Sequence, residues 1–85
     1  MQKIDYEKLT IYELEAFKLV LLDMTEALSV NLVLDMSEVL KIDMPAIQLL
    51  LATQKSCQLQ GFELKLSGLS EKVVRIFKYF NLNIA

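Results

Sequence analysis

Apolar residues recur at helical spacing in the first third of the chain. The run Thr10-Ile11-Tyr12-Glu13 has the pattern of a capping box, in which the Thr10 hydroxyl can accept from the Glu13 amide while the Glu13 carboxylate reaches back. Apolar residues three or four positions apart follow this run. They predict a first helix near residues 11–28, with an apolar stripe made of Leu14, Phe17, Leu21, Met24 and Leu28.

A second helix is predicted by the residues at its two ends. Asp43 is placed to cap its start, and Pro45 suits a first helical turn, where a missing N–H does no harm. The helix should run to about Gln60, because Gly61 can end it in a left-handed conformation. Its apolar stripe contains Ile47, Leu50 and Leu51.

A third, shorter helix is predicted near the end of the chain. Ser70 is placed to cap its start, and Asn81 can supply a left-handed end. The residues predicted to share its apolar face are Val73, Phe77 and Phe80.

Three short segments between the helices have the character of strands. Residues 30–34 are mostly apolar, which predicts a strand covered on both faces. Residues 62–66 alternate strictly, so one face should be buried, and residues 3–6 form a less regular candidate. The order β-α-β-α-β-α predicts one α/β domain over residues 1–85, with a mainly parallel sheet and helices packed chiefly on one face.

Composition narrows the function without naming it. The chain is 54% apolar with a net charge of −2, which excludes a disordered segment and argues against the basic face that nucleic-acid binding needs. It has no His and one Cys, so we expect no enzyme activity, no metal and no cofactor. No secretory signal and no apolar span of about 20 residues is found, and we therefore expect a cytoplasmic protein.

The segment from Leu32 to Val39, followed by Ile42 to Leu50, resembles the STAS domain, a family named after sulfate transporters and anti-sigma factor antagonists. The family core reads as an apolar strand, Asp-Leu-Ser, a few residues, Ile-Asp-Ser/Thr-x-Gly and then a Leu-rich helix. Here Asp35-Met36-Ser37 and Ile42-Asp43-Met44-Pro45-Ala46 stand in the matching places. The resemblance covers roughly residues 8–82 and implies a small α/β fold and a non-catalytic, protein-binding role in bacterial regulation or signal transduction.

Two positions depart from the family pattern. In regulated members the residue after the second Asp is the Ser or Thr that a partner kinase phosphorylates, and here it is Met44. The family's Gly two residues later is Ala46. The resemblance therefore implies a constitutive binder, because Met44 has no hydroxyl and offers instead a flexible side chain that adapts to a partner's surface.

The contacts made by the family imply a partner-binding surface at the start of the second helix, made of Asp43, Met44, Pro45 and Gln48. In the regulatory branch the partner resembles an ATP-dependent anti-sigma kinase or a component of a signalling or chemotaxis pathway. The alternative is an accessory STAS subunit that binds the ATPase of a lipid-asymmetry ABC transporter. The run Lys78-Tyr79-Phe80-Asn81-Leu82 resembles the tail of such subunits.

Asp35 and Asp43 also invite comparison with a phosphoacceptor or Mg²⁺ site at the end of a strand. A receiver domain would need a lysine at a strand end as well, whereas Lys65 falls inside a predicted strand. The favoured interpretation is that Asp35 ends a strand and Asp43 caps a helix. We expect the lone Cys57 to pack as a small apolar side chain.

Two runs carry more apolar residues than one helix face buries, namely residues 19–22 and residues 49–52. They predict that part of the first two helices presents apolar surface to another protein, and that the chain can self-associate. The aromatic residues Phe77, Tyr79 and Phe80 are expected to be core residues with one exposed tip. They do not predict a stacking surface for nucleic acid, because no basic groove accompanies them.

Overall fold

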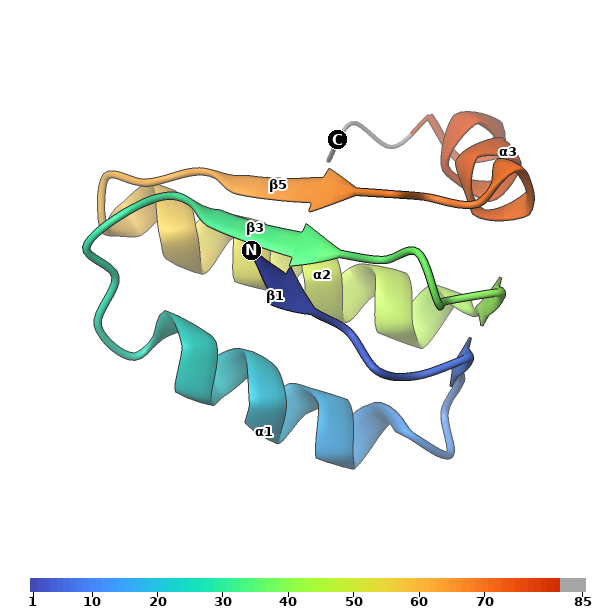
Figure 1. Ribbon diagram of the computed structural model, residues 1–85, viewed down its shortest axis with the longest axis horizontal. Coiled ribbons are helices and arrows are strands. Elements are labelled where there is room, and N and C mark those ends of the chain that lie inside the picture. Colours follow the sequence, from blue (N-terminus) through green and yellow to red (C-terminus); the bar gives the residue numbers. More distant parts are fainter. Residues whose placement is uncertain (82–85) are drawn as a thin grey trace.

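Three parallel strands form the central sheet, in the order β1-β3-β5 (Figure 1). The computed structural model describes residues 1–81, with β1 at Gln2–Lys3, β3 at Leu32–Asp35 and β5 at Leu64–Ser67. Asp35 on the middle strand is in register with Lys3 on one side and Ser67 on the other. The predicted mainly parallel sheet is confirmed.

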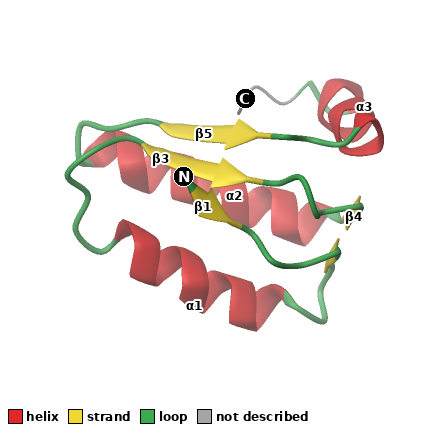
Figure 2. Ribbon diagram, viewed as in Figure 1, coloured by secondary structure: helices red, strands yellow, loops and turns green. Residues whose placement is uncertain are grey.

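A second, smaller sheet lies where the second helix, α2 (Met44–Leu59), begins (Figure 2). Its two parallel strands, β2 (Lys8–Leu9) and β4 (Lys41–Ile42), are two residues long, too short to show a period in the sequence. Leu9 and Ile42 are buried and in register, while Lys8 and Lys41 face solvent side by side. This small sheet joins the segment before the first helix, α1 (Leu14–Thr25), to the segment before α2.

Two helices, α1 (Leu14–Thr25) and α2 (Met44–Leu59), lie side by side against the sheet (Figure 1). Consecutive right-handed crossovers from β1 to β3 and from β3 to β5 place both helices on the same face. The third helix, α3 (Glu71–Tyr79), lies beyond the end of β5. The prediction of helices chiefly on one face is confirmed.

The opposite face of the sheet is only partly covered. Leu32 and Leu34 of β3 are buried against the helices, whereas Val33 and Asp35 are half-buried. The prediction that this strand is covered on both faces is therefore wrong, because the two crossovers place their helices on one side only. The alternation predicted for the last strand is confirmed, with Lys65 exposed between buried neighbours.

The core fills the space between the two helices and the sheet. Its largest fully buried side chains include Phe17 and Leu21 of α1, Ile47 and Leu50 of α2, and Leu34 of β3. Cys57 is also buried there as a free thiol, as expected, and burial raises the pKa of that thiol.

The first helix is shorter than the predicted 11–28, and contacts at each end explain why. At its start, both the backbone N–H and the hydroxyl of Thr10 donate to Glu13 Oε1, at 3.0 and 2.8 Å. The Glu13 carboxylate thus reaches back as predicted, but the Thr10 hydroxyl donates to it and does not accept from the amide. At its end, the Gln60 side chain donates to the Thr25 carbonyl at 2.7 Å and accepts from the Leu28 N–H at 3.2 Å.

The other two helices begin as predicted. Asp43 accepts from the Ala46 N–H, and the Ser70 hydroxyl accepts from the Val73 N–H at 3.2 Å. Asn81 has the predicted positive φ, at 55°. Phe80 does not share the buried face of α3, because it caps the helix and is exposed, where its ring meets that of Tyr79 edge to face.

Two glycines with positive φ allow a matched test of how tightly the strand ends pack. Gly61 has a φ of +84° and open space where a Cβ would stand. Gly68 has a φ of +70°, and a Cβ there would lie 3.1 Å from Asp35 Oδ1 and 3.1 Å from Ser37 Cβ. We expect Gly61→Ala to lower the free energy of unfolding by about 1 kcal/mol, the cost of the backbone conformation alone.

Gly68→Ala should cost about 1 kcal/mol more than Gly61→Ala, because the added methyl group also crowds the turn after β3. Urea unfolding of both variants measures the difference. Equal losses would contradict the close packing of Gly68 against that turn.

Candidate functional site

The surface around the start of α2 is held together by one carboxylate. Asp43 Oδ1 accepts from the Ala46 N–H at 3.3 Å, which caps the helix, while Oδ2 accepts from the Ile11 N–H at 2.9 Å. The Asp43 N–H in turn donates to the Leu9 carbonyl at 3.1 Å. Asp43 therefore fixes the loop before α1 against the first turn of α2, although the two segments are 32 residues apart in sequence.

The four residues predicted to bind a partner all lie at this place, but in different roles. Gln48 is exposed, Met44 and Pro45 are half-buried, and Met44 packs partly against the core. Both oxygens of Asp43 are engaged by backbone N–H groups, so its role is to position the surface. Asp43 is the cap that the sequence predicts.

Sequence reasoning missed three exposed apolar residues beside these four. Ile11 is 62% exposed, Tyr12 is 90% exposed and Leu40 is 52% exposed. Ile11 and Tyr12 border a hollow of about 480 Å³ together with Lys8, Lys41 and Asp43. We call the set Ile11, Tyr12, Leu40, Met44, Pro45 and Gln48 the docking surface. The sequence predicts that the first helix begins near Ile11, whereas α1 begins at Leu14 and leaves Ile11 and Tyr12 in the turn before it.

Lys8 and Lys41 give the rim of this hollow a positive charge. They are in register on adjacent parallel strands, and like charges placed opposite each other in a sheet repel. Within residues 1–81 neither takes part in a salt bridge. The acidic neighbours Glu13 and Asp43 have their carboxylates bonded to Thr10 and to backbone amides, so the rim presents its two ammonium groups to an approaching surface.

The first turn of α2 is poorly suited to hold a phosphate or another anion. A helix N-terminus binds anions through its free backbone N–H groups. Here Pro45 has no N–H, the Ala46 N–H is bonded to the Asp43 side chain, and the Ile47 N–H donates to the Asp43 carbonyl at 3.1 Å. The Asp43 carboxylate itself occupies the position that an anion would take.

The other conspicuous carboxylate, Asp35, ends β3 as the sequence predicts. Its Oδ1 accepts from the Ser37 N–H at 3.0 Å. Hydrogen bonds from the Ser37 hydroxyl and N–H lower the pKa of Asp35 below its usual value. Nearby, Lys3 Nζ lies 2.7 Å from Glu38 Oε2, and this pairing raises the pKa of Lys3.

The described residues offer neither a cluster of metal-ligating side chains nor a helix that could span a membrane. No group of three or more His, Cys, Asp or Glu side chains that could hold a metal ion is found in residues 1–81. None of the helices in the same range is long and apolar enough to cross a membrane.

Comparison with known proteins places the chain in one family. The sequence model of a family described as "Mlab, STAS domain" matches residues 7–84, which is nearly the whole chain. A search of curated proteins finds no match.

Proposed function

The chain belongs to the STAS domain family, and on this premise we propose that it is a non-catalytic protein-binding module of the anti-sigma factor antagonist type. The observation that carries the proposal is the docking surface. Its apolar side chains Ile11, Tyr12 and Leu40 are exposed beside the start of α2, where the family's contacts lie. Exposed apolar side chains grouped within a charged rim are typical of a protein–protein contact.

Met44 makes this module constitutive in our proposal. The position after the capping aspartate is occupied by a thioether side chain that no kinase can phosphorylate, at a place where it can adapt to a partner. Ser70 and Ser37 carry hydroxyl groups that a kinase could phosphorylate in place of residue 44, but both hold other positions in the fold. Ser70 caps α3, and Ser37 is bonded to Asp35, so neither stands at the start of α2.

The absence of a switch can be tested once a partner is in hand. Incubation of the chain with a kinase of the anti-sigma type and ATP should leave the affinity for the partner unchanged, because Met44 accepts no phosphate. Calorimetry before and after incubation measures the affinity, and mass spectrometry reports any phosphate gained. A phosphate on Ser37 accompanied by loss of the partner would contradict a constitutive module.

Two classes of partner are compatible with the docking surface. The first is an ATP-dependent anti-sigma kinase or a component of a signalling pathway. The second is the ATPase of a lipid-asymmetry ABC transporter, which would make the chain an accessory subunit. The tail resemblance adds little, because Leu82 lies outside the described residues.

Capture from native lysate on the immobilised chain separates these classes. We expect one dominant partner, identified by mass spectrometry as a sigma-pathway kinase or as an ABC ATPase. The same capture with Tyr12→Ala should retain less of it, because Tyr12 is almost fully exposed and its loss removes contact area without disturbing the core. A partner retained equally by the variant would contradict the assignment of Tyr12 to the interface.

A further inference from the structure

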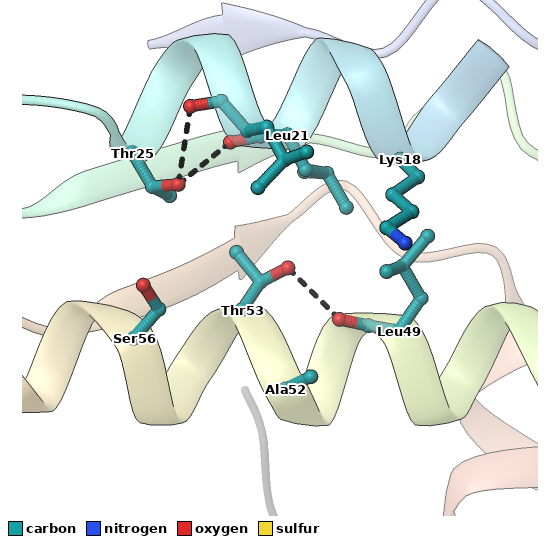
Figure 3. A pocket seen from close by; sticks show the side chains of 8 residues that line it. Lys18, Leu21, Thr25, Leu49, Ala52, Thr53 and Ser56 are labelled. Atoms are coloured by element: carbon teal, nitrogen blue, oxygen red, sulfur yellow. Dashed lines mark hydrogen bonds between the residues drawn. The ribbon is translucent and has the colours of Figure 1, made fainter. Parts of the chain in front are cut away.

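A groove runs between α1 and α2 (Figure 3). Leu22, Leu49 and Ala52 supply its apolar part, and its volume is about 160 Å³. Lys18 stands at the end nearer the helix starts, and Thr25 and Ser56 stand at the other end. The apolar runs at residues 19–22 and 49–52 thus contribute Leu21, Leu22, Leu49 and Ala52 to an open groove between the two helices.

Two of the four polar residues that line this groove have hydroxyl groups that are hydrogen-bonded to their own helix. The Thr25 hydroxyl donates to the Leu21 carbonyl at 2.9 Å, and the Thr53 hydroxyl donates to the Leu49 carbonyl at 2.8 Å (Figure 3). Lys18 takes part in no salt bridge with any other described residue. The groove therefore offers an apolar surface, with one free cation at its end, to whatever covers it.

The exposed face of α1 carries side chains that complement those of the groove. Glu15, Leu19, Leu22 and Glu26 are spaced at four, three and four residues, so they lie on one face of the helix, and all four are exposed. Leu19 is 63% exposed and Leu22 is 55% exposed. This stripe is apolar in the middle and acidic at both ends.

We propose that a second copy of the chain covers this groove, with α1 of each copy seated antiparallel in the α1–α2 groove of the other. A two-fold axis makes such a contact closed, because each copy supplies both a stripe and a groove. The antiparallel arrangement places Glu26 of one copy at the Lys18 end of the other copy's groove. It also places Leu22 of one copy against Leu22 of the other at the centre.

Charge supports a second copy as the occupant. The helix α1 with its two caps carries four acidic residues, Glu13, Glu15, Asp23 and Glu26, against one lysine, Lys18. Lys18 is also the one charged residue among those that line the groove. When α1 of one copy lies in the groove of the other, an acidic helix therefore meets a groove whose one charged lining residue is basic. The weak net charge of −2 opposes association of two copies very little.

Sedimentation equilibrium of the intact chain tests the proposal directly. We expect the weight-average mass to rise with concentration from 9.8 kDa towards twice that value. Leu22→Lys should weaken association about tenfold or more, because it places an unpaired charge at the centre of the contact. Tyr79→Lys introduces the same charge at an exposed position of α3 and should leave association unchanged.

If Leu22→Lys disturbs folding, reversing the charges of residues 18 and 26 provides a second test of the proposal. Lys18→Glu and Glu26→Lys should each weaken association, because each places like charges together across the contact, and the double variant should restore it. The same monomeric mass at every concentration would overturn the proposal. A dimer that is unaffected by Leu22→Lys and shows no coupling between residues 18 and 26 would overturn it as well.

Discussion

Replacing Asp43 by alanine should lower the free energy of unfolding by about 2–3 kcal/mol. The change removes the cap of α2, which contributes about 1 kcal/mol, and leaves the Ile11 N–H without its charged acceptor at 2.9 Å. The loop that carries Ile11 and Tyr12 then loses its attachment to α2. Partner binding should fall with stability, since the two halves of the docking surface are no longer held together.

Two controls separate the cap from the charge in this experiment. Asp43→Asn keeps an acceptor for one amide and should cost less than about 1 kcal/mol. Asp23→Ala removes an exposed acidic residue from α1 and should change stability by less than about 0.5 kcal/mol. Urea unfolding followed by circular dichroism measures all three variants. A loss for Asp43→Ala no larger than that for Asp23→Ala would show that Asp43 does not join the two segments.

Replacing Met44 by aspartate should weaken partner binding by about 2 kcal/mol, which corresponds to about a thirtyfold higher Kd. The substitution places a charge inside the contact, where it has to lose its water when the partner binds. The fold should tolerate it, because an acidic side chain in the first helical turn interacts favourably with the helix dipole. Binding and stability should therefore respond differently to this change.

Calorimetric titration of the partner measures the effect, with two matched variants beside it. Met44→Ser should change the Kd by less than about threefold, because it introduces a small neutral hydroxyl and no charge. Lys72→Asp places an acidic residue in the first turn of α3 and should leave the Kd unchanged. If Met44→Asp binds as tightly as Lys72→Asp, the start of α2 is not the interface.

The parts of the fold that follow from local chemistry could be predicted from the sequence. Asp43 and Gly61 delimit α2 because capping and left-handed φ depend on the residues at the helix ends themselves. The strand β5 could be predicted because apolar and polar residues alternate along residues 62–66. The small strands β2 and β4 could not, since two residues carry no period.

The parts that depend on distant contacts could not be predicted in this way. Gln60 ends α1 early by bonding to Thr25, a residue 35 positions away, and no local pattern announces that contact. The same holds for the bond from Ile11 to Asp43, which attaches the loop before α1 to the start of α2. The position of Met44 at the candidate site came from a family resemblance, and the exposed residues around it became visible only in three dimensions.

Amide hydrogen exchange of the free chain and of its complex with the captured partner measures most directly where the partner touches the chain. We predict slower exchange on binding in residues 8–13 and 40–48, which contain the docking surface, and unchanged exchange in α3. Unchanged exchange in residues 8–13 and 40–48, with protection elsewhere in the chain, would contradict the proposed binding surface.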